Sequence, residues 1–239
     1  MTSPTTTTRV TGPCCLDVDS VRKSYPAPHG GSSLVLDVPE LRVEEAAQLA
    51  IEGESGSGKT TLLHIVAGLV TPDSGRVVVT GLDLTALDEA ARDRARAENI
   101  GVIFQSFNLL QPYTVLENVM LPMSFAGRAD VDRAAALLER VGLSDRLDYR
   151  PAQLSPGQQQ RVAIARALAN QPKLVLADEP TGSLDARRAE ASLALIREVC
   201  EEAGAALLLV SHNPSVLERF TDRACFADLN RARPRREEP

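Results

Sequence analysis

The chain of 239 residues is poor in the features on which several protein classes depend. It has no tryptophan, and aromatic residues make up only 3% of it, so the side chains on which single-stranded nucleic acids stack are scarce. Its formal net charge is -6, whereas proteins that bind nucleic acids usually present an excess of positive charge. Both features predict a protein without a nucleic-acid partner.

Long apolar runs are missing as well. No stretch approaches the roughly 20 apolar residues that a membrane-spanning helix requires, and residues 205–210 have only the length of a buried strand. The threonine-rich start has no apolar segment like that of a secretory signal. We therefore expect a flexible tail at residues 1–13 and a cytoplasmic location.

Cysteine is present without a recognisable arrangement. The four cysteines, at positions 14, 15, 200 and 225, show neither metal-ligand nor disulfide spacing. They are expected to be small reduced hydrophobic side chains in a cytosolic protein.

One loop organises what is present. Residues 53–60, GESGSGKT, match the phosphate-binding pattern G-x-x-x-x-G-K-[ST] at every fixed position. The glycines let backbone N–H groups approach an oxyanion, the lysine supplies a cation for the β- and γ-phosphates, and the threonine hydroxyl is a ligand for Mg²⁺. Residues 48–52 read as a strand and 61–67 as a helix, whose N-terminus favours bound phosphate. The residues expected to hold the phosphates are Gly53, Ser55, Gly56, Ser57, Gly58, Lys59, Thr60 and Thr61.

The remaining pattern predicts an α/β fold. The opening is rich in β-like segments, with strands expected at 16–21, 34–38 and 41–43 around a turn region at 26–33. The last third alternates apolar strands with helices, which is typical of a mainly parallel sheet flanked by helices. The expected elements there are a helix at 159–169, a strand at 173–177, a helix at 186–202, a strand at 205–210, a helix at 214–220 and a strand at 224–228.

The middle of the chain differs in character. Residues 106–164 are expected to form a helical subdomain inserted between core strands, since Thr114 and Glu117 have the spacing of a capping box and Asp130 precedes a helical apolar pattern. The predicted organisation is a flexible tail at 1–13, a nucleotide-binding core at 14–105 and 165–228, the inserted subdomain at 106–164, and a charged tail at 229–239.

Two carboxylates follow a predicted buried strand. Asp178 and Glu179 come directly after the apolar residues 173–177, and ligands of such sheets bind at the carboxyl ends of the strands. Asp178 is therefore a candidate for holding Mg²⁺ and Glu179 for orienting or deprotonating water. The alternative is a pair of solvated loop acids.

A second anion site is predicted at the start of the helix after Leu154. Ser155 is a suitable N-cap, Pro156 fits the first helical position, and Gln158 completes a capping box. By itself this is a good helix start; a helix start also carries unpaired N–H groups.

These motifs together resemble one superfamily. LSPGQ followed by QQRVAIARAL resembles the signature motif of ABC-type ATPases, in which LSGGQ is usual. The order and spacing match over nearly the whole chain, and the words SGSGKTTLLHIVAGL, IGVIFQSFNLL, TVLENV and ADEPTGSLD most resemble the lipoprotein-releasing and macrolide-exporter group of ATP-binding subunits. The resemblance implies a P-loop NTPase fold of ABC-ATPase type, with an N-terminal antiparallel β part and the inserted helical subdomain.

The resemblance also implies a role for individual residues, with ATP and Mg²⁺ as cofactors. Glu179 would be the general base, with His212, Gln105 and Lys59 completing the catalytic group, and Thr60, Gln105 and Asp178 would hold the metal. Tyr25 would stack on adenine. The residues that would act on the nucleotide of a second copy of the chain are Ser155, Gly157 and Gln158 of the signature, with Asp185 crossing the interface.

The function implied is that of an ATP-hydrolysing subunit that powers a separate transmembrane permease from the cytoplasmic face of the membrane. The group of ATP-binding subunits that the chain resembles suggests export or extraction of a lipid-like molecule, lipoprotein, peptide or drug, with membrane contact only through the permease. An ABC-type ATPase acting as a non-transport mechanical switch on a membrane partner is the alternative. A soluble ribosome or DNA factor would normally have two ATPase halves or a long coiled coil, and a kinase would have no use for the signature helix.

The sequence departs from the family pattern at two positions of interest. Pro156 replaces a glycine of the signature and lacks a backbone N–H. Asn213 stands where the family often has an aspartate after the histidine.

Overall fold

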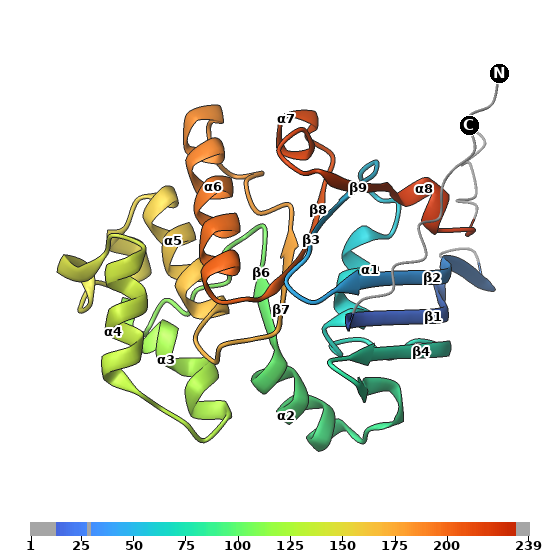
Figure 1. The fold of residues 1–239 in the computed structure, drawn as a ribbon, viewed down its shortest axis with the longest axis horizontal. Coiled ribbons are helices and arrows are strands. Elements are labelled where there is room, and N and C mark those ends of the chain that lie inside the picture. The colour runs from blue at the N-terminus through green and yellow to red at the C-terminus, as the bar shows by residue number, and fades with distance from the viewer. Residues whose placement is uncertain (1–12, 28–29, 233–239) are drawn as a thin grey trace.

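The fold contains two β-sheets with helices between and outside them (Figure 1). The computed structural model describes residues 13–27 and 30–232, so the expected tail at 1–13 lies outside the described residues except for Pro13. One sheet has the order β2-β1-β4-β5 and the other β6-β7-β8-β3-β9. The strands are β1 (Cys14–Pro26), β2 (Ser32–Glu44), β3 (Gln48–Glu52), β4 (Ser74–Val79), β5 (Leu82–Asp83), β6 (Ile100–Ile103), β7 (Leu174–Asp178), β8 (Ala206–Ser211) and β9 (Asp222–Cys225). The helices are α1 (Lys59–Val66), α2 (Glu89–Asn99), α3 (Val115–Phe125), α4 (Val131–Arg140), α5 (Pro156–Ala167), α6 (Ala186–Glu202), α7 (Pro214–Leu217) and α8 (Phe226–Leu229).

The second sheet is parallel and is buried on both faces. All four of its strand pairings are parallel. Successive residues of β7 and β8 pack into two different apolar clusters: Leu174 and Leu176 face one, and Val175 and Ala177 face the other. Because successive side chains point to opposite faces and both faces are buried, the two strands are continuous apolar runs in the sequence.

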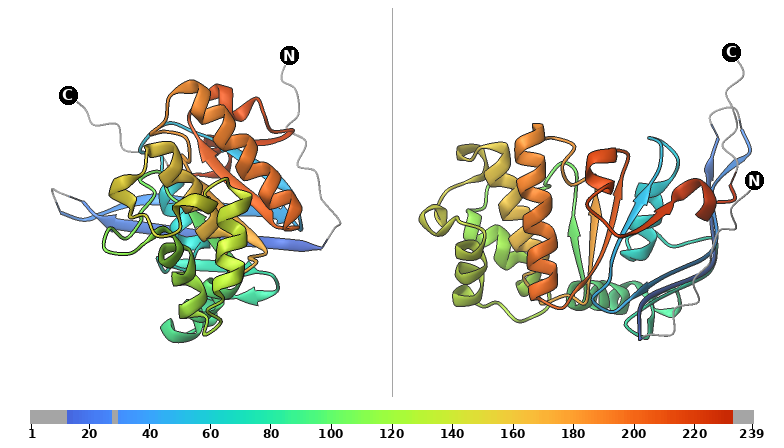
Figure 2. Two further views of the ribbon diagram at one scale, coloured as in Figure 1. Left: turned by 90° about the vertical axis from the view of Figure 1, so that its left-hand side faces the viewer. Right: turned by 45° about the horizontal axis from the view of Figure 1, so that its top comes forward.

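The layers follow from these two clusters. Helix α1 lies between the parallel sheet and the antiparallel sheet, while α5 and α6 cover the opposite face of the parallel sheet (Figures 1 and 2). Helices α3 and α4 pack against α5 further from the sheet. The start of α1 and the start of α5 are thus on opposite sides of the same sheet.

The antiparallel sheet has longer strands than predicted, since β1, expected at 16–21, runs from Cys14 to Pro26. Residues 34–38 and 41–43 were expected as separate strands, but β2 runs unbroken from Ser32 to Glu44 and pairs with β1 along its length. Pro39 lies in the middle of it. Because β2 is an edge strand, one of its sides needs no ladder hydrogen bonds, and proline is tolerated there.

The predicted C-terminal helix and strand are present, but with other bounds. The strand expected at 224–228 ends at Cys225, which pairs with Glu52 at the end of β3, and the chain then turns into α8. Phe226 is buried in the cluster around α1. Helix α7 ends at Leu217, earlier than the expected 220.

The expected charged tail also begins later than residue 229. Asn230 accepts a hydrogen bond from the Asp37 N–H at 2.8 Å and donates to the Val35 carbonyl at 2.9 Å. Ala232 is buried, and the expected tail beyond it, 233–239, lies outside the described residues. Residues 229–232 are thus packed against β2.

The helical subdomain contains the predicted helix starts. Thr114 and Glu117 form a capping box at α3, Ser155 and Gln158 form one at α5, and Asp130 caps α4. Helix α5 runs to Ala167 and so crosses the expected domain boundary at 164. The signature therefore begins a helix whose other end packs on the core.

The close packing of α5 on β6 depends on Gly101. A Cβ at this position would lie 2.2 Å from the Ala167 carbonyl oxygen. We expect Gly101→Ala to lower the free energy of unfolding by about 1–3 kcal/mol, because the added methyl must push the helix away. Urea denaturation measures this, and an unfolding free energy unchanged within about 0.5 kcal/mol would contradict the packing.

Candidate functional site

The phosphate loop joins β3 to α1 as predicted. Gly58 is the N-cap of α1 with a φ of 106°, and no side chain caps the helix there. Gly56 also has a positive φ, of 76°. Both backbones adopt a conformation that residues with a Cβ rarely tolerate, and the helix presents its first N–H groups to the loop.

The lysine of this loop is buried and folds back over it. The Lys59 ammonium donates hydrogen bonds to the carbonyls of Gly53 and Glu54, at 2.6 and 2.7 Å. Since both acceptors are uncharged, the positive charge stays available for an anion held by the same loop.

Asp178 lies at the end of β7 beside the loop. Thr60, the second residue of α1, is near enough to affect its carboxyl group. Burial raises the pKa of the Asp178 carboxyl and the charge of Glu179 adds to the effect, while Thr60 and the charges of His64 and Lys59 oppose it. A cation at this position would stabilise the ionised carboxylate.

The next residue, Glu179, is held by the end of β8. Its Oε2 accepts a hydrogen bond from Ser211 Oγ at 2.9 Å, and its Oε1 accepts one from the His212 backbone N–H at 2.9 Å. His212 Nδ1 lies 2.6 Å from the same Oε1. The Glu179 side chain is 12% exposed and that of His212 59% exposed. A fixed carboxylate next to an accessible imidazole is an arrangement suited to proton transfer.

The backbone of Glu179 is unusual as well. Its φ is 44°, in the left-handed region that non-glycine residues seldom occupy. The Glu179 carbonyl accepts a hydrogen bond from Gly182 N–H at 3.0 Å, which closes a tight turn. Such conformations persist where surrounding contacts enforce them, as at many functional sites.

Gln105 lies on the other side of this turn. It follows β6, and its carbonyl accepts a hydrogen bond from Ser183 Oγ at 3.2 Å. A Cβ on Gly182 would lie 3.1 Å from Gln105 Nε2. The structure thus gathers Lys59, Thr60, Asp178, Glu179 and His212 around one sheet edge, with Gln105 beside the turn that follows Glu179.

The signature residues are placed elsewhere. Ser155, Gly157 and Gln158 begin α5, on the face of the sheet opposite α1 (Figure 1). Asp185 caps α6, accepting a hydrogen bond from Arg188 N–H at 3.0 Å. Across the described residues, no hydrogen bond or ion pair joins this group to the phosphate loop of the same chain.

Tyr25 is also apart from the phosphate site. It lies near the end of β1 and is 38% exposed. The Lys23 ammonium is 5.6 Å from the centre of its ring. No hydrogen bond or cation–π contact among the described residues links this ring to the phosphate loop, so its stacking role stays a prediction.

Two residues near the site were not predicted. Gln160 is fully buried in α5 and bonds to the turn after Glu179. Asn230 donates to the Ser57 carbonyl at 3.4 Å and so connects the C-terminal segment with the phosphate loop. No local signal distinguishes Gln160 from Gln158 and Gln159 before it in the sequence, and Asn230 was placed in an expected tail.

The residues present fit a magnesium site with few protein ligands. No group of three or more His, Cys, Asp or Glu side chains with metal-site geometry occurs in the described part of the chain. Thr60 and Asp178 offer oxygen ligands at the same sheet edge. Mg²⁺ commonly takes one or two protein oxygens and fills its remaining positions with phosphate and water.

Known proteins share both the sequence and the fold. The family model described as ABC transporter matches residues 36–182. The lipoprotein-releasing system ATP-binding protein LolD of Shewanella oneidensis is 49% identical over 211 residues, covering 86% of this chain and 90% of that protein. The methionine import ATP-binding protein MetN of Rhodopseudomonas palustris is 42% identical over 218 residues, covering 90% of this chain and 58% of that protein.

A solved structure agrees with these relatives. The ATP-binding cassette MJ0796, described as dimeric, in a post-hydrolysis state and bound to ADP and Pi, superimposes with a TM-score of 0.81 at 35% identity and covers 93% of this chain and 97% of its own. Within residues 13–27 and 30–232, no helix has the length and hydrophobicity needed to span a bilayer. With the phosphate loop, the carboxylate pair and the signature helix in place, the chain belongs to the ABC transporter family as an ATP-binding subunit.

Proposed function

We propose that this ATPase hydrolyses ATP at the sheet edge around Glu179 and uses the cycle to drive a separate transmembrane permease. The observation that carries the proposal is the Glu179 carboxylate, fixed by Ser211 and His212 close to the phosphate loop. In this role Glu179 accepts the proton of the attacking water while the water oxygen bonds to the γ-phosphorus, and the bond from the γ-phosphorus to the β,γ-bridging oxygen breaks to release ADP. General-base catalysis of this kind contributes roughly 10²–10⁴-fold to a rate.

The other residues bind and orient the reactants. Lys59 and the loop N–H groups hold the phosphates, His212 contacts the γ-phosphate, and Gln105 orients the water. Thr60 and Asp178 would hold Mg²⁺, with Gln105 as a further ligand. When bound, the metal neutralises charge on the phosphate oxygens. Tyr25 stacks on adenine.

A second copy of the chain is required to complete the site. Ser155, Gly157 and Gln158 lie on the far side of the sheet from their own phosphate loop, so they serve the nucleotide held by a partner copy. Asp185 accepts a hydrogen bond from the Arg188 N–H, and the Arg188 side chain would lie 3.7 Å from a Cβ on Gly157. Asp185 therefore lies at the same interface. The dimeric state of the similar cassette supports this arrangement.

Pro156 leaves the signature fewer N–H donors than the usual motif. The Gln158 N–H is already bonded to Ser155 Oγ in the capping box, at 3.3 Å. The hydroxyl proton of Ser155 and the N–H of Gly157 remain to donate to the γ-phosphate. Gln158 therefore acts chiefly by holding Ser155 in place.

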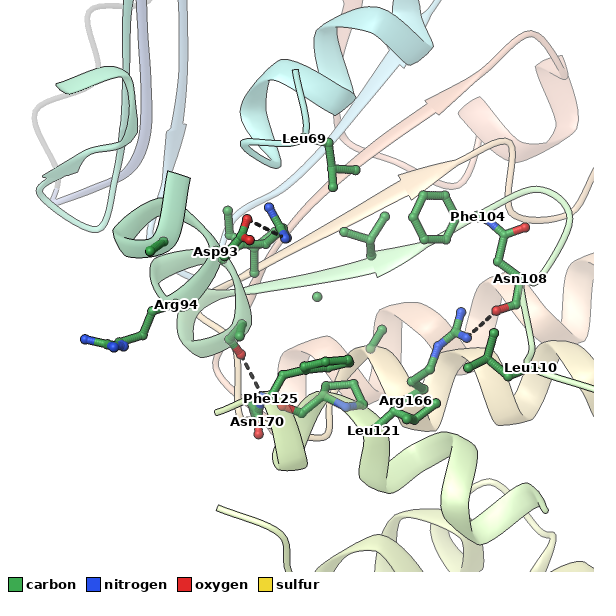
Figure 3. A pocket seen from close by; sticks show the side chains of 18 residues that line it. Leu69, Asp93, Arg94, Phe104, Asn108, Leu110, Leu121, Phe125, Arg166 and Asn170 are labelled. Carbon is green, nitrogen blue, oxygen red and sulfur yellow. Dashed lines mark hydrogen bonds and ion pairs between the residues drawn. The ribbon is translucent and has the colours of Figure 1, made fainter. Parts of the chain in front are cut away.

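The permease is proposed to dock in a groove between the core and the helical subdomain. A cavity of ≈ 600 Å³ is bordered by α2, β6, α3 and α5 (Figure 3). Phe125, Leu110 and Leu69 line it and are 81%, 45% and 46% exposed. An apolar groove with such exposed side chains is typical of a protein-binding surface.

This groove is connected to Gln105. Arg166, in the wall of the groove, donates to the carbonyls of Phe107 and Asn108, both at 2.6 Å. Both residues have positive φ angles, 57° and 50°, and burial lowers the pKa of Arg166 to about 10. A partner seated in the groove presses on the segment that follows Gln105.

Phe125→Glu is expected to abolish stimulation of the ATPase by the permease, because a carboxylate cannot enter an apolar contact without a large desolvation cost. Basal ATPase activity is expected to stay unchanged. The measurement compares phosphate release with and without the co-expressed permease in lipid nanodiscs. Leu82→Glu, at an exposed apolar residue of β5, is the matched control. Full stimulation of Phe125→Glu would exclude the groove.

The proposed substrate is based on the similarity to the relatives. The identity with LolD supports extraction or export of a lipoprotein or another lipid-like molecule, peptide or drug, from a position on the cytoplasmic face of the membrane. Co-purification with the permease, followed by an ATP-dependent release assay on membrane-bound lipoprotein, tests this. Stimulated hydrolysis without any movement of substrate would instead favour the mechanical switch.

A further inference from the structure

Helix α5 is joined to the catalytic turn by one buried amide. Gln160 is 0% exposed, and its Nε2 donates a short hydrogen bond to the Pro180 carbonyl. Its Oε1 accepts a hydrogen bond from Ser192 Oγ of α6 at 2.8 Å. Both the NH2 and the oxygen of the amide are therefore hydrogen-bonded, and these two bonds connect α5 with α6 and with the turn after β7.

The turn that Gln160 holds begins with the proposed general base. Pro180 directly follows Glu179, whose φ of 44° needs enforcement by its surroundings. The hydrogen bond from Gly182 N–H to the Glu179 carbonyl closes the turn on one side. Gln160 fixes it on the other, because a buried carbonyl without a donor would be costly.

The same helix carries the signature at its start. Ser155 and Gln160 are five residues apart, about 7.5 Å along the helix axis. A hydrogen-bonded helix moves as one body over this length, so a displacement at Ser155 is a displacement at Gln160. In the described part of the chain, no hydrogen bond or ion pair joins α5 to the phosphate loop, which separates the effect of α5 from nucleotide binding.

We propose that Gln160 is a positioning residue that couples the two nucleotide sites of the dimer. Ser155 acts on the nucleotide of the partner copy, whereas Glu179 acts on the nucleotide of its own chain. When the signature of one chain engages the partner's nucleotide, α5 shifts the Pro180 carbonyl through Gln160 and brings Glu179 of the same chain into line. This inference rests on the proposed ATP-sandwich dimer and adds the route by which its halves communicate.

The test uses Gln160→Met, which keeps the length of the side chain and removes both hydrogen bonds. We expect kcat to fall about tenfold or more while ATP affinity stays within about twofold. The Hill coefficient for ATP is expected to exceed 1 in the parent protein and to be about 1 in the variant. Ser192→Ala is the matched control, since it removes one partner of the amide but leaves the Pro180 bond; its Hill coefficient should equal that of the parent.

Three outcomes would overturn the inference. They are an unchanged kcat and Hill coefficient in Gln160→Met, an equal loss of cooperativity in Ser192→Ala, and a loss of ATP affinity that accounts for the slower turnover. Should Gln160→Met fail to fold, Gln160→Asn, whose amide is one methylene short of Pro180, carries the same expectations. A variant that carries only Glu179→Gln, with Gln160 intact, tests the dimer separately. If it stays monomeric with ATP, the proposed dimer is wrong, and this result is distinguishable from a failure of the Gln160 link.

Discussion

Glu179→Gln is expected to reduce ATP turnover by roughly 10²–10⁴-fold while ATP affinity stays unchanged. The amide has nearly the shape of the carboxylate, and its single oxygen can still accept one of the two bonds that Ser211 Oγ and the His212 N–H donate to Oε2 and Oε1. It cannot take up the proton of the attacking water. Phosphate release at saturating ATP measures the turnover, and titration with a fluorescent ATP analogue measures the affinity.

The control for this substitution removes a carboxylate elsewhere. Glu201 is exposed near the end of α6, and Glu201→Gln is expected to keep the turnover of the parent protein. A Glu179→Gln variant that retains turnover within about threefold of the parent would show that another group accepts the proton.

Lys59→Ala is expected to weaken ATP binding by roughly 100-fold or more, because truncating one side of a buried charged contact typically costs several kcal/mol. The ammonium is held over the loop by the Gly53 and Glu54 carbonyls, so its position is set before the nucleotide arrives. Isothermal titration calorimetry with ATP measures the loss.

The same variant needs a check on folding. Lys59 is buried, and its removal also deletes two hydrogen bonds within the loop, so thermal unfolding should accompany the titration. Lys173→Ala, at an exposed lysine before β7, is the control and is expected to bind ATP normally. Unchanged affinity in a folded Lys59→Ala variant would contradict the assignment of the loop.

Much of the fold was predictable because its signals are local. The apolar runs at 173–177 and 205–210 form β7 and β8, shifted by one residue. The capping boxes at Thr114 and Ser155 start α3 and α5 as expected. For the same reason the phosphate loop was recognisable, since its glycines and lysine act within a few residues of one another.

What the sequence did not reveal depends on contacts between distant segments. β2 continues through Pro39 because it lies at the edge of its sheet, a position that only the assembled sheet defines. β9 stops at Cys225 because its partner β3 stops at Glu52, and Phe226 then turns into the core. The bonds of Gln160 to Pro180 and of Asn230 to β2 join residues 20 and 195 positions apart.

The central claim is that one nucleotide is held by two chains, each of which supplies the part that its own site lacks. Static light scattering on Glu179→Gln tests it most directly, with ATP and Mg²⁺ present and with ADP as the control. We predict twice the mass of one chain with ATP and a single chain with ADP, because only the γ-phosphate reaches the partner's Ser155 and Gly157. A single chain under saturating ATP and Mg²⁺ would contradict the account.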